Sequence, residues 1–116
     1  MSIAITEPSF WILSALAGGR RHGYGIMREV SELSGGRTTL KVPTLYATLD
    51  RLEAAGLIDQ DGEEVVDGRA RRYYTLTDDG SSALRAEAEA LQARARVATA
   101  RLASRVRPVR ASGAIA

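Results

Sequence analysis

Two hydroxyl groups and a guanidinium group are spaced to fall on one side of a helix in the middle of the chain. The polar face comprises Thr44, Ala47, Thr48 and Arg51. The opposite face comprises Leu45, Leu49 and Leu52. Pro43 favours a first helical position and Gly56 the position just past the end. Because threonine and arginine side chains hydrogen-bond to base edges and phosphates, the pattern predicts a DNA recognition helix with the polar face in the major groove.

A charged β-hairpin is predicted directly after that helix. Asp67 and Gly68 stand between two extended segments, and Asp-Gly favours a two-residue hairpin turn. The expected cross-strand pairs are Val66–Arg69, Val65–Ala70, Glu64–Arg71 and Glu63–Arg72. At the base, Ile58 can share the core with Tyr74 and Leu76 only if the register shifts by one residue. We therefore expect a bulge near Asp61 and Gly62.

Basic side chains around these two elements are candidates for contacts with the DNA backbone or, from the wing tip, with an adjacent minor groove. They are Lys41, Arg69, Arg71 and Arg72. Arg69 has no acidic partner across the hairpin. Arg71 and Arg72 each have a glutamate opposite, so each either pairs with it or contacts DNA. Because neighbouring strand residues face opposite sides, we expect only one of these two to point at DNA.

Composition sets limits on the class of protein. The chain has 116 residues, no cysteine and a net charge of +2, so it forms neither disulfides nor thiolate metal sites. Its longest apolar run, Phe10 to Leu13, is too short for a bilayer, and the N-terminus lacks signal-peptide features. We expect a cytoplasmic protein with no membrane partner. Seven acids lie between Asp50 and Asp67, whereas six arginines and no acid follow from Arg94 onward.

The sequence offers no catalytic constellation. His22 is the only histidine and precedes Gly23, so it is interpreted as a structural cap at a helix start. Glu63 and Glu64 are interpreted as hairpin pairs, not as an acid–base pair. With no nucleophile–base pair, metal constellation or phosphate loop, we expect no enzyme activity, no metal ion and no cofactor.

Two helices are predicted before the recognition helix. The first spans 7–17 with Thr6 as N-cap, and is apolar nearly all round, which suggests burial on two sides. We interpret Phe10 and Trp11 as core and dimer-interface residues. The second helix runs from His22 or Gly23 to Leu33, with a core stripe ending at Leu33. A short strand is expected at 39–41.

A long helix is predicted after the hairpin, capped by the turn that begins at Thr77. Its apolar positions recur at heptad spacing. They are Leu84, Ala88, Leu91, Ala95, Ala98 and Leu102. A single small domain offers no partner for so long a seam, so these residues are predicted to form a dimer.

The expected fold is mostly α-helical with a small β-hairpin: a winged helix-turn-helix with a long C-terminal dimerisation helix. Residues 1–80 are predicted as the DNA-binding domain, 81–107 as the dimerisation helix and 108–116 as a disordered tail.

Three motifs, in order, resemble the PadR family of transcriptional regulators. They are RRHGYGI at 20–26, TLYATLDRLEAAGLI from Thr44, and RRYYTLTDDG at 71–80. The resemblance implies a homodimeric, usually repressing regulator that binds an inverted-repeat operator in double-stranded DNA, with one C-terminal helix as in the small subfamily. It also places Tyr46 at the edge of the recognition helix, where its hydroxyl either contacts a phosphate or packs in the core.

Small relatives of this kind hold flat aromatic compounds between subunits. The resemblance therefore makes Trp11 a candidate contact for a small aromatic effector. The alternative function is a winged-helix module that binds another protein without sequence-specific DNA binding. The arginine-bearing wing and Lys41 favour DNA, and the seven acids between Asp50 and Asp67 favour the alternative.

Overall fold

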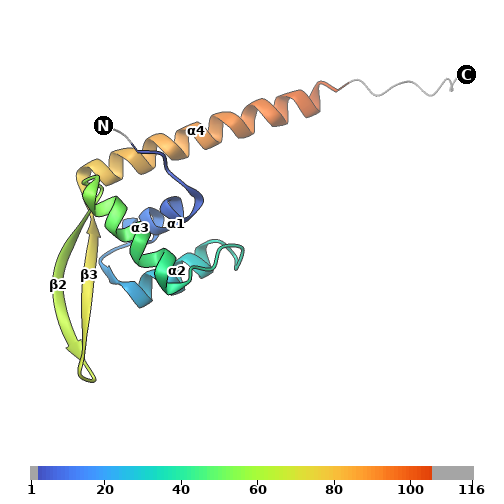
Figure 1. The fold of residues 1–116 in the computed structure, drawn as a ribbon. Helices are drawn as coiled ribbons and strands as arrows, with labels where there is room; N and C mark the ends of the chain where they lie inside the picture. The colour runs from blue at the N-terminus through green and yellow to red at the C-terminus, as the bar shows by residue number, and fades with distance from the viewer. Residues whose placement is uncertain (1–2, 106–116) are drawn as a thin grey trace, which may run out of the picture.

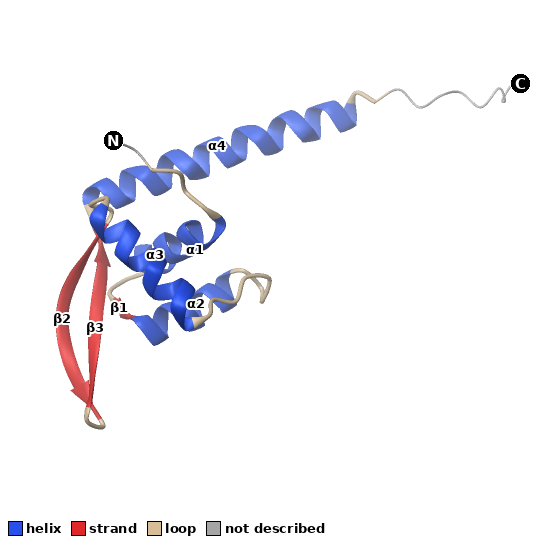
Figure 2. Ribbon diagram, viewed as in Figure 1, coloured by secondary structure: helices blue, strands red, loops and turns tan. Residues whose placement is uncertain are grey.

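The structure is a computed structural model that describes residues 3–105. Three helices surround the core, a β-hairpin projects from it, and a long fourth helix runs past it (Figure 1, Figure 2). The elements are α1 (Glu7–Ala17), β1 (Arg21–His22), α2 (Gly23–Leu33), α3 (Val42–Ala54), β2 (Ile58–Val66), β3 (Arg69–Leu76) and α4 (Asp78–Ala103). Among the described residues, no helix has the length and apolarity needed to cross a membrane.

Side chains cap three of the helices as predicted. Thr6 Oγ1 accepts a hydrogen bond from the Ser9 amide at 3.2 Å, and His22 Nδ1 accepts one from the Gly25 amide at 3.1 Å. Thr77 Oγ1 accepts from the Gly80 amide at 2.9 Å at the start of α4. Each cap satisfies an amide that the first helical turn leaves unpaired.

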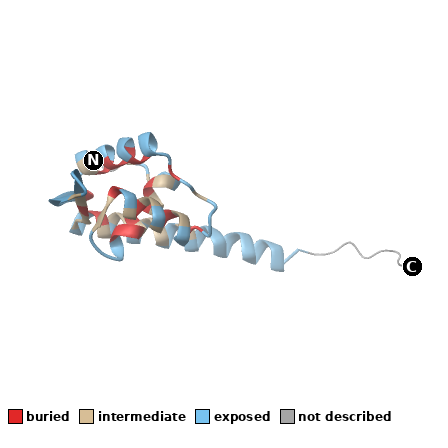
Figure 3. Ribbon diagram, turned by 90° about the horizontal axis from the view of Figure 1, so that it is seen from below, coloured by how far each residue is buried: buried red, intermediate tan, exposed pale blue. Residues whose placement is uncertain are grey.

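The core lies between α1, α2, α3 and the base of the hairpin (Figure 3). Its largest buried side chain is Tyr74 of β3, which joins aliphatic residues of the helices. The prediction that Leu33 belongs to the core is wrong. Leu33 is 48% exposed, because α2 ends there and the chain turns away through glycines. The predicted stripe on α2 therefore stops one turn earlier, at Val30.

The hairpin has the predicted register from tip to base. Val66 pairs with Arg69 and Ile58 with Leu76, and the register shifts between Gln60 and Glu63. The shift confirms the bulge that the core-facing residues require. The strand expected at 39–41 is wrong: that segment is irregular, and the third strand is β1, which pairs with β3 to give the order β1-β3-β2.

The start of α4 is fixed to the start of β2. The Thr77 amide donates to the Leu57 carbonyl at 3.1 Å, and the Thr77 hydroxyl donates to the Gly56 carbonyl at 2.7 Å. A Cβ atom at Gly80 would overlap the Leu57 backbone, so only glycine allows this approach. α4 then runs along α1, and every residue from 92 to 105 is exposed (Figure 3).

Candidate nucleic-acid interface

Helix α3 presents a solvent-facing side between its buried leucines. The exposed positions include Thr44, Tyr46, Ala47, Asp50 and Arg51. The prediction that Thr48 lies on the exposed polar face is wrong. Thr48 is only 6% exposed, and its hydroxyl donates to the Thr44 carbonyl at 2.8 Å. A threonine three residues after Leu45 shares its face, and the bond to the helix backbone satisfies the buried hydroxyl. Thr48 therefore lies on the buried side of α3.

Two other side chains of α3 have partners on neighbouring helices. Arg51 is exposed, but one Nη donates to the Ser9 hydroxyl at 3.0 Å, which directs the guanidinium toward α1. Tyr46 is 43% exposed, and a Cβ at Gly23 would lie 2.6 Å from its hydroxyl. The Tyr46 ring thus packs across the start of α2 while part of it remains in solvent, between the two predicted alternatives.

The two faces of the wing carry different arginines. Tyr74 faces the core, so the alternate residues Arg72 and Ala70 lie on the side of α3. Together with Tyr46 and Glu63 they line a pocket of about 330 Å³ between α3 and the wing. Arg72 therefore adjoins the recognition helix.

The opposite face of the sheet also carries His22 of β1, the strand that pairs with β3. Arg71 lies there, with one Nη 3.5 Å from His22 Nε2. Because His22 Nδ1 accepts the capping hydrogen bond, a neutral His22 carries its proton on Nε2, so Arg71 meets another donor there. Burial lowers the pKa of His22, and the charge of Arg71 lowers it further.

The predicted glutamate–arginine pairs align in register without closing into ion pairs. Within residues 3–105 the ion pairs are Arg20–Asp61 and Arg21–Glu29. Glu64 instead accepts a hydrogen bond from the Tyr73 hydroxyl at 3.0 Å, and this bond raises the pKa of Tyr73. Arg69 is exposed beside the turn, where Asp67 and Gly68 have φ of 51° and 75°.

Sequence reasoning missed two features of this surface. Asp50 lies on the outward side of α3, one turn after Ala47, and its carboxylate is an acceptor among the proposed DNA-facing groups. Arg20, which the sequence prediction included only in a family motif, contacts both strands of the wing. The helical period signals the first feature, but no local pattern signals the second, which joins residues 41 positions apart.

The predicted dimer residues divide into two groups. Leu84 packs against the core of its own chain, so the first part of the seam does have a partner within the subunit, contrary to expectation. Leu91 lines a pocket of about 290 Å³ with Phe10 and Trp11. Farther along α4 the remaining seam positions are exposed, and Leu102 is 65% exposed.

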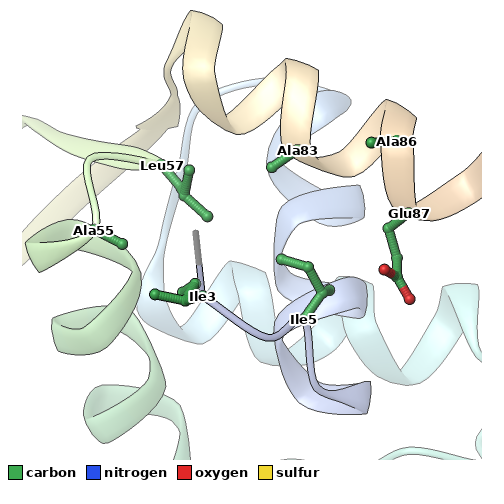
Figure 4. A pocket seen from close by; sticks show the side chains of 7 residues that line it. All are labelled: Ile3, Ile5, Ala55, Leu57, Ala83, Ala86 and Glu87. Atoms are coloured by element: carbon green, nitrogen blue, oxygen red, sulfur yellow. The ribbon is translucent and has the colours of Figure 1, made fainter. Parts of the chain in front are cut away.

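Trp11 occupies a mixed environment. Its Nε1 donates to Glu7 at 2.8 Å, and its ring meets Phe10 edge to face at 5.1 Å between centroids. A more apolar pocket, of about 260 Å³, lies between the N-terminal segment, the end of α3 and α4 (Figure 4). Glu87 is its one ionisable lining residue, and the sequence prediction singled out none of its lining.

Helices α2 and α3 followed by the β2–β3 wing define a winged helix-turn-helix protein, as predicted. The chain belongs to the transcriptional regulator PadR-like family, whose sequence model matches residues 12–86. The members of that family are transcriptional regulators, so this chain is a PadR-like regulator and not an enzyme.

Individual relatives agree with this assignment. Transcriptional regulator Rv3488 of Mycobacterium tuberculosis is 44% identical over 85 residues, which cover 73% of this chain and 76% of that protein. A PadR family regulator from Clostridium difficile superposes with a TM-score of 0.70 at 29% identity, covering 84% of this chain and 99% of that one. Bacillus subtilis PadR, solved with operator DNA, shares the fold: TM-score 0.59, 24% identity, 86% of this chain and 48% of that one.

Proposed function

We propose that this regulator binds operator DNA as a homodimer and represses transcription. The observation that carries the proposal is the adjacency of the exposed side of α3 to the Arg72-bearing face of the wing, which share one pocket through Tyr46 and Arg72. A helix entering the major groove brings such a wing face against the flanking phosphates. Bacillus subtilis PadR, which shares this fold, was solved in complex with operator DNA, and this supports DNA as the ligand.

The contacts divide by chemistry. Thr44, Ala47 and Arg51 are proposed to face base edges, with Arg51 released from Ser9. Lys41 precedes α3, and Arg69 is near the wing tip, so both are proposed to contact phosphates. Of Arg71 and Arg72, Arg72 is proposed as the third phosphate contact, because Arg71 lies on the face toward His22.

Dimerisation is proposed through the exposed half of α4 and the Phe10–Trp11 edge of α1. Exposed Leu102 and Ala98 continue the row that Leu91 begins, and a second α4 would remove this row from water. A two-fold dimer presents two recognition helices, so an inverted-repeat operator follows from its symmetry.

The test is nuclease protection of the region upstream of the protein's own gene, combined with a reporter driven by that promoter. We expect a protected inverted repeat with half-site centres about one helical turn apart, and lower reporter output when the protein is expressed. Equal binding to the protected sequence and to a scrambled one, at the same salt concentration, would reject sequence-specific recognition. Such a result would favour the protein-interaction module, for which the exposed acids of β2 are the supporting feature.

An effector site is proposed beside Trp11. The pocket between α1 and α4 also holds Glu7, Glu87 and Arg94, so a flat aromatic ligand there would meet charged groups at its edge. Trp11 is the one tryptophan in the chain, and its fluorescence reports occupancy directly. Planar aromatic compounds that leave both Trp11 emission and operator binding unchanged would argue against the site.

A further inference from the structure

Arg20 lies in the turn between α1 and β1, and its guanidinium contacts the wing at several points. Its Nε and Nη2 donate to the Asp61 carbonyl at 3.0 and 2.8 Å, and Nε also lies 3.2 Å from the Asp61 carboxylate. Its Cζ lies 3.9 Å above the centroid of the Tyr73 ring. One side chain of the helical body therefore contacts both β2 and β3.

The contact falls at the bulge of the hairpin. Asp61 and Gly62 have no partner in the β2–β3 register, which resumes at Glu63. A bulge leaves its extra residue unpaired and bends the strand. Arg20 supplies donors to the Asp61 carbonyl at this point, and its Nη2 would lie 3.1 Å from a Cβ at Gly62.

Beyond the bulge the wing has no third strand beside it. β1 is two residues long and pairs only with Tyr73 and Tyr74, so the hairpin from Glu63 to Arg72 continues as a two-stranded ribbon. Such a ribbon is marginally stable and free to bend without a third strand. Its direction relative to α3 depends on what grips it at the bulge.

Tyr73 connects the Arg20 contacts to the part of β2 beyond the bulge. Tyr73, whose ring lies under Arg20, donates its hydroxyl to Glu64 at 3.0 Å. These contacts form a series. Asp61 of β2 contacts Arg20 of the helical body, Arg20 contacts Tyr73 of β3, and Tyr73 contacts Glu64 of β2. We propose that Arg20 is a positioning residue that sets the orientation of the wing relative to the recognition helix.

The inference extends the proposed function by naming what holds the wing in place for binding. A wing that is already oriented loses less conformational freedom on binding, which favours affinity without adding a contact. The rival role for Arg20 is a direct phosphate contact, since half of its side chain is exposed. Wing motion measured without DNA separates the two roles.

The experiment uses the absence of cysteine from the chain. Val65→Cys, at a position of β2 that is 70% exposed, provides one site for a fluorescent label near the wing tip and outside the pocket that Ala70 lines. We expect Arg20→Ala to increase the amplitude of nanosecond motion in time-resolved anisotropy. Arg20→Lys should give an intermediate increase, because an ammonium cannot span the carbonyl and the ring together. Arg69→Ala is the matched control: it removes an arginine of the same wing and should leave the amplitude unchanged.

Two further variants divide the contacts. Tyr73→Leu removes the ring under Arg20, and Asp61→Ala removes the carboxylate while keeping the carbonyl; each should raise the amplitude by less than Arg20→Ala. In DNA titrations, Arg20→Ala should weaken operator binding by roughly tenfold. Unchanged wing motion in folded Arg20→Ala or Arg20→Lys protein would overturn the proposal. If such a variant also binds operator DNA more weakly, the result would assign Arg20 to a direct phosphate contact. A protein that binds no operator at all would reject the proposed function and leave the wing measurement valid.

Discussion

Single residues decide how strongly the proposed surface grips DNA. Lys41 and Arg69 are exposed at opposite ends of that surface, where a phosphate contact costs little desolvation. Arg69→Ala should weaken binding to operator and unrelated DNA alike, and reduce the salt dependence by about one unit per lost phosphate contact, or about two in a symmetric dimer. Titrations at several salt concentrations measure this slope.

Arg71 and Arg72 of the wing provide a matched pair for the same measurement. Arg72 faces the pocket shared with Tyr46, whereas Arg71 lies beside His22. Arg72→Ala should therefore reduce the salt slope and Arg71→Ala should not. An effect from Arg71→Ala alone would mean that the outer face of the wing meets DNA.

The His22 cap makes stability depend on pH. Burial and Arg71 lower its pKa in the folded state, so the unfolded chain binds the proton more readily. The stabilisation is therefore complete above the ordinary histidine value of about 6.5 and is lost as pH falls through the lower folded-state value. Chemical unfolding between pH 7.5 and 5 should show this loss.

His22→Asn is the control for that titration. Asparagine also caps helices but does not titrate in this range. The variant should be less sensitive to pH over the same interval. Identical pH dependence in both proteins would show that the carboxylates, and not His22, set the acid response.

At the scale of elements, the start of α4 lies close against the turn that precedes β2. Gly80→Ala adds a methyl group that overlaps the Leu57 backbone and approaches Leu76. Relieving that overlap moves the start of α4, and overpacking of this kind costs roughly 1–3 kcal/mol. Denaturant unfolding should show the loss.

Ser82→Ala, an exposed change in the same helical turn, controls for the general effect of adding alanine there. Its midpoint should match or exceed that of the unmodified protein, because alanine favours helix. A Gly80→Ala protein with unchanged stability would mean that α4 can shift without loss.

Elements were predictable from sequence where local chemistry decides them. The caps at Thr6, His22 and Thr77 each depend on one side chain and a nearby amide, and the hairpin register depends on its turn and on which residues face the core. β1 was not predictable, because Arg21 and His22 become a strand only through pairing with β3, far along the chain.

The errors on α3 have a different origin. The period of 3.6 residues places Thr48 beside Leu45, but a polar side chain suggested solvent. Its bond to the Thr44 carbonyl removes most of the cost of burial. Likewise, no periodicity could reveal that Arg20 meets Asp61 and Tyr73, since that contact depends on the angle of the wing.

At the scale of the whole molecule, the first half of α4 packs against the body of its own subunit and the second half extends into solvent. Leu84 packs on the core, whereas every residue from 92 to 105 is exposed, including Leu102 on the predicted seam. A helix that leaves such a row in water gains stability from a second copy. We expect light scattering at micromolar concentration to give about twice the 12.4 kDa mass of one chain.

Leu102→Glu tests which face of α4 makes the dimer. A carboxylate on the seam would be buried against the partner subunit and lose hydration, so dissociation should increase by at least tenfold. Ala100→Glu places the same charge outside the seam, on another exposed position, and should remain dimeric. Because Leu102 contacts none of the core residues, the dissociated Leu102→Glu subunit should remain folded and keep its helical circular dichroism signal. If the unmodified chain is a folded monomer, the proposed dimer through α4 is rejected. The inverted-repeat operator is then rejected too, because one recognition helix alone reads one half-site.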